Sequence, residues 1–142
     1  MIEHKHKINS LEITSIRSFS NEKGSLSFVE KDQDISFNIA RAFYIYDVGI
    51  GEVRGRHAHK KCHQFFICLN GSIKVICDDG KNQVEFLLDS PRKGLHLPPT
   101  IWSLQKYLSP NSILLCLNDL IYDESDYIRN YQSFLDFRGQ SK

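Results

Sequence analysis

The sequence predicts an all-β fold, a β-barrel followed by a C-terminal helix. Residues 24–118 consist of short apolar or alternating segments separated by turn signals, a pattern typical of sandwiches and barrels. The pairs Asn70-Gly71 and Asp79-Gly80 favour tight turns between neighbouring strands. Only the tail changes period, because its apolar residues recur at helical spacing. With 142 residues, no internal repeats and no linker, we expect one domain over 1–142.

The expected strands follow one another along the chain. They are rich in aliphatic and aromatic residues and are separated by Gly, Pro, Asn, Asp and Ser. We expect them within 42–48, 64–69, 72–77, 84–88, 95–97 and 113–117. In the tail, Glu124, Ser125 and Asp126 are of the type that caps and starts a helix. That helix is expected to carry on one side Tyr127, Ile128, Tyr131, Phe134 and Leu135.

Composition excludes several classes of partner. The 18 Lys and Arg residues almost balance the 17 Asp and Glu residues, so no basic field indicates nucleic-acid binding. No apolar stretch approaches the roughly 20 residues that span a bilayer. The N-terminus lacks the apolar segment of a secretory signal. The 4 cysteines show no CxxC spacing, which indicates buried, reduced thiols. We therefore expect a cytoplasmic protein that binds neither nucleic acid nor membranes.

The run GRHAHKK at 55–61 lies between two apolar alternating segments and is the most informative feature of the chain. In a β-strand, residues i and i+2 share one face, so we expect His57 and His59 to point into one site. Two convergent imidazoles form either half of a metal site or an acid/base pair.

The spacing around these histidines resembles the first motif of the cupin superfamily, in which HxH and an acidic residue project into a small β-barrel. The matching positions are Gly51, His57, His59, Gln64 and Gly71. The second cupin motif is degraded here, within 97–103, and Ser103 stands at the position of its histidine. The resemblance implies a cupin-type jelly-roll β-barrel.

The residues at the remaining cupin positions argue against a metal. A metal cupin would offer three imidazoles and a carboxylate. Here Gln64 replaces the carboxylate and Ser103 the third histidine, so two good ligands remain. Two imidazoles rarely hold a metal against water. Two strand histidines without a function are another alternative, but the glycine spacing directs the pair into the barrel. We therefore expect no metal and a metal-free acid/base pair.

Imidazole suits this work because its unperturbed pKa of about 6.5 allows it to take and return protons near neutral pH. Two imidazoles on one strand face can serve two neighbouring atoms of a substrate. Proton abstraction next to a carbonyl, followed by proton return to the adjacent carbon, is the natural reaction for such a pair. An isomerisation of this kind requires no redox cofactor, and we expect none.

Four longer stretches resemble the sugar-nucleotide 3,4-ketoisomerases, which are metal-independent cupins that act on thymidine-diphosphate (dTDP)-4-keto-6-deoxyglucose. They are KGSL at 23–26, RAFYI at 41–45, RGRHAHKK at 54–61 and YDESDYIRNY at 122–131. The resemblance covers roughly residues 10–137. It implies an isomerase that makes a dTDP-3-keto-6-deoxyhexose, which an aminotransferase then converts to a 3-amino sugar for surface polysaccharide such as lipopolysaccharide O-antigen or S-layer glycan. It also implies a homodimer with exchanged N-terminal strands.

The resemblance also implies roles for individual residues. The two histidines, His57 and His59, carry the proton transfers through an enediol or enolate. Arg54 helps to orient or neutralise the diphosphate or the developing oxyanion. Four further residues are assigned to substrate binding, namely Arg41, Gln64, Lys23 and Ser103.

The chain departs from the family pattern at several positions. Phe43 stands where relatives have tyrosine, and Ser103 and Leu104 stand where relatives have a basic residue and a glutamate. Lys23 occupies a position that varies between a cation and an aromatic. These departures leave the C4 configuration of the product open, and Lys23 and Ala58 favour the galacto over the gluco form.

Two other functions remain as alternatives, a sugar-nucleotide 3,5-epimerase-like cupin and a non-catalytic sugar-binding cupin module. Structural roles are expected for the remaining conspicuous residues. Barrel packing is expected for Tyr44, Tyr46, Phe65 and Phe66, and simple accommodation for His63 and His96. The segment 122–131 is expected to close the barrel or the dimer, and His4 and His6 lie at a terminus expected to fray.

Overall fold

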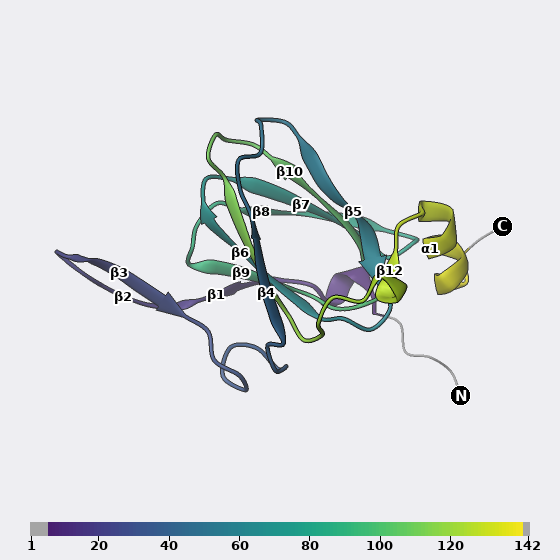
Figure 1. Ribbon diagram of the computed structural model, residues 1–142, viewed down its shortest axis with the longest axis horizontal. Helices are drawn as coiled ribbons and strands as arrows, with labels where there is room; N and C mark the ends of the chain where they lie inside the picture. The colour runs from purple at the N-terminus through teal and green to yellow at the C-terminus, as the bar shows by residue number, and fades with distance from the viewer. Residues whose placement is uncertain (1–5, 141–142) are drawn as a thin grey trace.

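Two five-stranded sheets and a separate hairpin make up the fold in the computed structural model, which describes residues 6–140 (Figure 1). The first sheet contains, in order, β1 (Ile13–Ser15), β9 (Lys93–Leu97), β6 (Gln64–Asn70), β11 (Ile113–Asn118) and β4 (Arg41–Ile45). The second contains β12 (Tyr127–Ile128), β5 (Val53–His59), β10 (Trp102–Tyr107), β7 (Ile73–Asp78) and β8 (Gln83–Leu88). Within residues 6–140, no strand of one sheet pairs with a strand of the other. The all-β prediction is confirmed, but the barrel is not closed, and the fold is a jelly-roll-like pair of sheets.

Side chains from both sheets form the main core. They alternate along their strands, as the period of two requires when one face of a strand is buried. The most buried members are Cys68, Ile73, Val75, Cys77, Leu88, Leu95, Tyr107 and Cys116. All four cysteines are free and buried, as predicted. Among the described residues, no helix is long and apolar enough to span a membrane.

A β-bulge interrupts β5 immediately before the two histidines. Across the antiparallel pair β5–β10, His57 lies opposite Ser103 and Arg54 lies opposite Gln105, so two residues of β5 face one residue of β10. Gly55 occupies the bulge with φ +102°, a left-handed conformation that glycine adopts readily. Because the bulge adds one residue, Arg54 shares the face of His57, whereas strict alternation would place it on the opposite face.

The C-terminal helix begins later than predicted. Glu124–Asp126 form a 3-10 turn, and β12 follows and pairs with β5, with Tyr127 opposite His59. The helix α1 spans Tyr131–Arg138 and starts where Asn130 accepts a hydrogen bond from the backbone N–H of Ser133 at 2.9 Å. The helical start predicted at 124–126 is therefore wrong, because the edge of β5 satisfies the backbone of Tyr127 and Ile128 and Asn130 supplies the cap.

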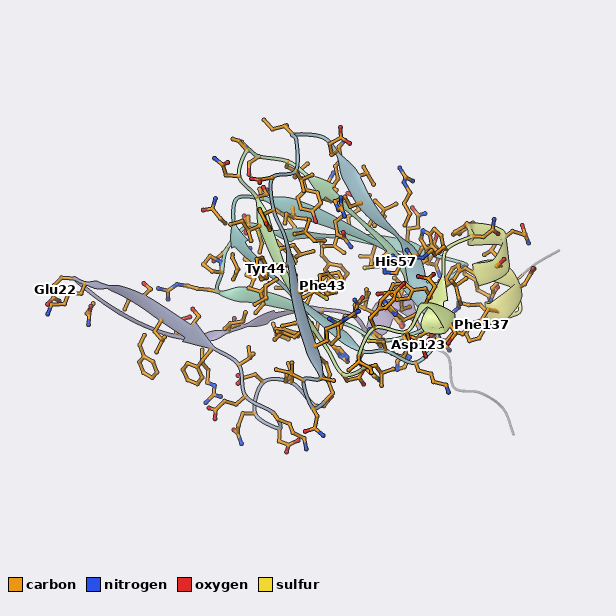
Figure 2. All side chains as sticks on the ribbon, viewed as in Figure 1. Glu22, Phe43, Tyr44, His57, Asp123 and Phe137 are labelled. Carbon is orange, nitrogen blue, oxygen red and sulfur yellow. The ribbon has the colours of Figure 1, made fainter. Side chains whose placement is uncertain are left out.

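The hairpin of β2 (Arg17–Asn21) and β3 (Gly24–Phe28) projects away from the two sheets (Figure 1). Phe19 and Leu26 on this hairpin are 68% and 63% exposed. Glu22, next to Lys23 in the turn, lies at the far end of the molecule from His57 (Figure 2). The hairpin thus leaves apolar side chains uncovered in a single protomer.

The packing predicted for the aromatic residues is confirmed in part. Phe65 and Phe66 on β6 are both buried, Phe66 in the main core and Phe65 in a second apolar cluster. Tyr44 and Tyr46 are instead exposed, and their rings stack on each other with centroids 5.9 Å apart. They lie on the outer side because Phe43 and Ile45 occupy the inner face of β4.

Candidate active site

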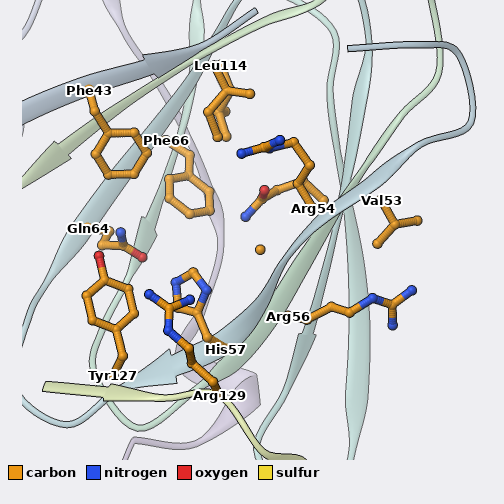
Figure 3. Close-up of a pocket in the computed structure, with 13 residues that line it drawn as sticks. Phe43, Val53, Arg54, Arg56, His57, Gln64, Phe66, Leu114, Tyr127 and Arg129 are labelled. Carbon is orange, nitrogen blue, oxygen red and sulfur yellow. The ribbon is translucent and has the colours of Figure 1, made fainter. Parts of the chain in front are cut away.

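The two histidines of β5 lie at a cavity of about 370 Å³ between the two sheets. Their ring centroids are 5.1 Å apart and the ring planes are nearly perpendicular, at 85°. His57 lines the cavity, whereas His59 is only 4% exposed and lies behind it. The core residues Phe66 and Leu114 form part of the cavity wall (Figure 3). The structure therefore brings the predicted pair together but gives its members different access to a substrate.

Asp126 fixes the orientation of His59. Its Oδ2 lies 2.9 Å from Nδ1 of His59, and its carboxylate also accepts hydrogen bonds from the backbone N–H groups of Lys61 at 2.7 Å and Cys62 at 3.3 Å. A carboxylate only accepts hydrogen bonds, so Nδ1 of His59 carries the hydrogen and Nε2 keeps its lone pair. Nε2 is buried and has no hydrogen-bond partner among the described residues. His59 is thus held as a proton acceptor.

Both imidazoles are neutral at physiological pH. Burial lowers the pKa of His57 to about 4, and the positive charge of Arg129 and the proximity of His59 act in the same direction. Burial also lowers the pKa of His59, although Asp126 opposes this shift. A neutral imidazole can accept a proton from a substrate carbon or oxygen, so the pair is ready for base catalysis.

Tyr127 connects the histidines to the first sheet. Its ring centroid lies 5.0 Å from that of His57 and 4.3 Å from that of His59. Its hydroxyl accepts a hydrogen bond from Nη2 of Arg41 at 3.1 Å. Tyr127 lines the cavity, and Arg41 reaches the site through this contact.

Arg129 closes the site from the C-terminal segment. Its guanidinium lies 4.3 Å above the ring of Tyr127 and pairs with the Glu124 carboxylate through two hydrogen bonds, of 2.7 and 2.9 Å. Arg129 holds the pKa of Glu124 at about 2, so this ion pair persists over the whole physiological range. Arg129 also lines the cavity and adds positive charge next to His57.

The bulge of β5 supplies another cation. Arg54 extends into the cavity toward Phe66 and Leu114, whereas Arg56 points away from them (Figure 3). A guanidinium at this position suits a diphosphate or a developing oxyanion. Gln64, also predicted to bind substrate, lines the cavity on the opposite side.

Three residues predicted to bind substrate do not line this cavity, and one of them, Arg41, reaches it only through the hydroxyl of Tyr127. Lys23 lies in the turn of the projecting hairpin, remote from the histidines of its own protomer. Ser103 is buried and lies across from His57 on β10, behind the cavity wall. His63 and His96 also lie elsewhere, joined by a contact of 2.9 Å between Nδ1 and Nε2, consistent with the accommodation expected for them.

The sequence interpretation missed the contribution of segment 122–131. Asp126, Tyr127 and Arg129 all belong to this segment and all contact the histidines or the cavity. The sequence does contain a signal for these residues, because the string YDESDYIR lies in one of the stretches that resemble the sugar-nucleotide 3,4-ketoisomerases. The apolar spacing of this segment predicts a helix, and a helix would give these residues a structural role.

Among the described residues, one group of three potential metal ligands converges, with ligand atoms within 4.8 Å of one another. It consists of His59, Cys62 and Asp126. Their chemistry fits a hydrogen-bonded cluster better. His59 and Asp126 bind each other, and burial raises the pKa of the Cys62 thiol to about 11, which keeps it protonated.

Comparisons with known proteins identify the family of the chain. The family model described as FdtA: WxcM-like, C-terminal, matches residues 9–139. A TDP-4-oxo-6-deoxy-alpha-D-glucose-3,4-oxoisomerase from Aneurinibacillus thermoaerophilus is 41% identical over 122 residues, which cover 86% of this chain and 88% of the relative.

Two solved structures agree closely with the fold. The sugar 3,4-ketoisomerase QdtA from Thermoanaerobacterium thermosaccharolyticum, in complex with TDP, superposes with a TM-score of 0.89 at 34% identity, covering 94% of this chain and 98% of QdtA. The TDP-quinovose 3,4-ketoisomerase WlaRB from Campylobacter jejuni gives a TM-score of 0.86 at 36% identity, covering 91% and 99%. The chain therefore belongs to the FdtA family and is an isomerase of the sugar 3,4-ketoisomerase type.

Proposed function

We propose that the protein converts dTDP-4-keto-6-deoxyglucose into a dTDP-3-keto-6-deoxyhexose. One observation carries this proposal: the neutral His57 lines a cavity directly in front of His59, whose Nε2 is kept free for a proton by Asp126. The name of the relative from Aneurinibacillus thermoaerophilus, a TDP-4-oxo-6-deoxy-alpha-D-glucose-3,4-oxoisomerase, supports the choice of substrate.

His57 acts as the base at the sugar carbon, because it is the histidine that lines the cavity. It removes the proton from C3, the electron pair of the C3–H bond forms a C3=C4 double bond, and O4 takes up a proton to give an enediol. O3 then loses its proton, C3=O forms, and C4 receives a proton. His59 relays protons between the oxygens through Nε2. Because protons and electrons balance within the sugar, the reaction needs no redox cofactor, and in this scheme the two histidines move the protons without a metal.

Two guanidinium groups support the negative charges in this scheme. Arg54 extends into the cavity, and Arg129 lies at its edge beside Tyr127. An oxyanion at C3 or C4 and the diphosphate of the nucleotide both favour such groups. Arg41 contributes indirectly by holding the hydroxyl of Tyr127.

An incubation with dTDP-4-keto-6-deoxyglucose in deuterated buffer, followed by NMR, tests this function. We expect the carbonyl to move from C4 to C3 and one deuterium to appear at C4, with and without a chelator. Exchange at C3 and C5 without carbonyl migration would instead indicate a 3,5-epimerase. That alternative merits the comparison because His59–Asp126 and the neighbouring Tyr127 offer a His-Asp dyad and a tyrosine.

We further propose a homodimer in which the β2–β3 hairpins are exchanged. The hairpin projects with Phe19 and Leu26 exposed, and β4 at the edge of its sheet pairs only with β11 among the described strands. An uncovered edge strand and uncovered apolar side chains are both satisfied by a second copy of the chain. In such a dimer, Lys23 would approach the cavity of the partner subunit rather than its own.

We infer the C4 configuration of the product from the sequence pattern. Lys23 and Ala58 favour the galacto product, although Ala58 packs against Trp102 and Ile128 and does not line the cavity. The C4 configuration is measured by the proton couplings of the product in the same NMR experiment. We place the reaction in the cytoplasm, before an aminotransferase that makes a 3-amino sugar for a surface polysaccharide.

A further inference from the structure

Asn118 is a fully buried amide on β11 whose orientation is determined by its neighbours. Its Nδ2 donates hydrogen bonds to the carbonyl oxygens of Cys116 at 3.3 Å and Arg41 at 3.4 Å. Carbonyl oxygens only accept, so the NH₂ group must lie on this side. Oδ1 of Asn118 therefore faces the other way and serves as an acceptor.

Gln64 on β6 is oriented in turn by Asn118. Its Nε2 donates to Oδ1 of Asn118 at 2.9 Å and to Sγ of Cys116 at 3.3 Å. A flip of the Gln64 amide would place two carbonyl oxygens against each other, so the amide is locked. Both side-chain hydrogen bonds of Gln64 are made by Nε2, so Oε1 is turned away from Asn118 and Cys116 and lies on the side of His57 (Figure 3).

A locked amide has a consequence for recognition. Gln64 is only 2% exposed yet lines the cavity, and it presents an oxygen there rather than a nitrogen. That oxygen can accept a hydrogen bond from a hydroxyl but cannot bind a keto oxygen. A ligand that lacks a hydroxyl at this position leaves the acceptor unpaired and binds less tightly.

We propose that Gln64 is a specificity-determining residue that accepts a hydrogen bond from the C2 hydroxyl of the sugar, and that Asn118 is its positioning residue. This inference rests on the proposed ketoisomerisation. In that reaction, O3 and O4 exchange between hydroxyl and keto forms. C2 is the ring carbon next to the reacting pair that carries a hydroxyl in substrate, enediol and product alike. The Gln64 amide cannot flip, so its oxygen suits the C2 hydroxyl, which remains a hydroxyl throughout the reaction.

The test compares dTDP-4-keto-6-deoxyglucose with its 2-deoxy analogue. For the wild type we expect kcat/KM to fall about 10- to 100-fold on the analogue, as for a lost hydrogen bond to a buried acceptor. In Gln64→Met, which keeps the length of the side chain, we expect this preference to shrink to less than about 3-fold. Asn70→Leu, on the same strand but outside the cavity, is the control and is expected to keep the wild-type preference.

The role of Asn118 is tested by a double-mutant cycle. We expect Asn118→Leu to reduce the preference for the C2 hydroxyl, and to have no further effect on it in the Gln64→Met background. Losses that simply add would show that Asn118 acts on the fold rather than through Gln64.

The outcomes separate this inference from the proposed function. An inactive wild type contradicts the ketoisomerase proposal. An active wild type that accepts the 2-deoxy sugar equally well contradicts the assignment of Gln64. Equal losses for Gln64→Met on both sugars would mean that Gln64 serves a reacting oxygen and not C2. If Asn118→Leu does not fold, the comparison of the wild type with Gln64→Met on the two sugars still decides whether Gln64 recognises the C2 hydroxyl.

Discussion

Asp126 and the two histidines form a chain of contacts in which each group determines the state of the next. The backbone N–H groups of Lys61 and Cys62 hold the carboxylate, the carboxylate holds Nδ1 of His59, and the ring of His59 lies edge-on to that of His57. Burial then keeps both rings neutral by lowering their pKa values. Two neutral bases result from these contacts and this burial, and the tautomer of His59 is fixed by Asp126.

Replacing the histidines by asparagine separates their roles. General acid/base catalysis is worth about 10²- to 10⁴-fold, so His57→Asn and His59→Asn are each expected to lose at least about 10²-fold in turnover. Without the carbon base, His57→Asn should show no deuterium exchange at C3 by NMR. His59→Asn, which loses only the relay, is expected to exchange slowly without forming product. Near-normal turnover in both folded variants would refute the acid/base assignment.

Asp126→Asn tests the tautomer of His59. An amide can donate to Nδ1, which would move the hydrogen of the imidazole to Nε2 and remove the free lone pair. We expect a loss of about 10²-fold in kcat or more, with KM little changed. Asp136→Asn, on the exposed side of α1, is the matched control and is expected to retain full activity. Unchanged kcat in Asp126→Asn would show that the tautomer is irrelevant.

The pH dependence of kcat/KM reports the pKa of His57. Because burial lowers this pKa to about 4, the base stays unprotonated well below the ordinary pKa of imidazole, about 6.5. We expect the acid limb of the profile to lie near pH 4 to 5. A limb near 6.5 would contradict the buried, neutral state of His57.

The lowered pKa values of buried histidines also affect the stability of the protein. The pKa of His96 is also lowered to about 4, again by burial. The unfolded chain therefore binds more protons than the folded chain between about pH 6.5 and 4. The free energy of unfolding, measured in urea, is expected to fall as the pH is lowered through that window.

At the level of secondary structure, the bulge at Gly55 decides which side chains of β5 meet the substrate. Its φ of +102° favours glycine, and an added Cβ would lie 2.6 Å from Nε2 of Gln105, so the Gln105 side chain would have to move. The extra residue turns Arg54 to the face of His57. A regular strand would leave the cavity without this cation.

Gly55→Ala is therefore expected to destabilise the protein by about 1–3 kcal/mol and to displace Arg54. Loss of a charge-assisted contact to substrate predicts a fall of about 10- to 100-fold in kcat/KM. Gly51→Ala is the matched control, because Gly51 has φ +86° but no atom within 4 Å of an added Cβ. The Gly51→Ala variant therefore has backbone strain but no side-chain clash, and it is expected to keep its activity. Thermal unfolding and steady-state kinetics of both variants measure the difference.

At the scale of the whole molecule, the projecting hairpin is the feature on which the proposed homodimer rests. Light scattering is expected to give the mass of a dimer. Replacing the exposed pair by Phe19→Ser and Leu26→Ser removes the apolar surface that a partner subunit would cover, so this variant is expected to shift toward the monomer. A monomeric wild type at micromolar concentration would contradict strand exchange.

The sequence by itself determined the all-β class and the meeting of His57 with His59, because both depend on the period of two along a strand. It also indicated the family through local strings such as RGRHAHKK and YDESDYIR. These features are local in the chain, so neighbouring residues are sufficient to specify them.

Only the tertiary structure decided which further groups complete the site. Asp126 meets His59 across 67 positions of sequence, and it does so because β12 pairs with β5 at a point where a helix had been expected. Arg54 enters the cavity because the register of β5 against β10 shifts at Gly55. Strand pairing and register depend on contacts between distant segments, and the apolar spacing of a single segment does not contain them.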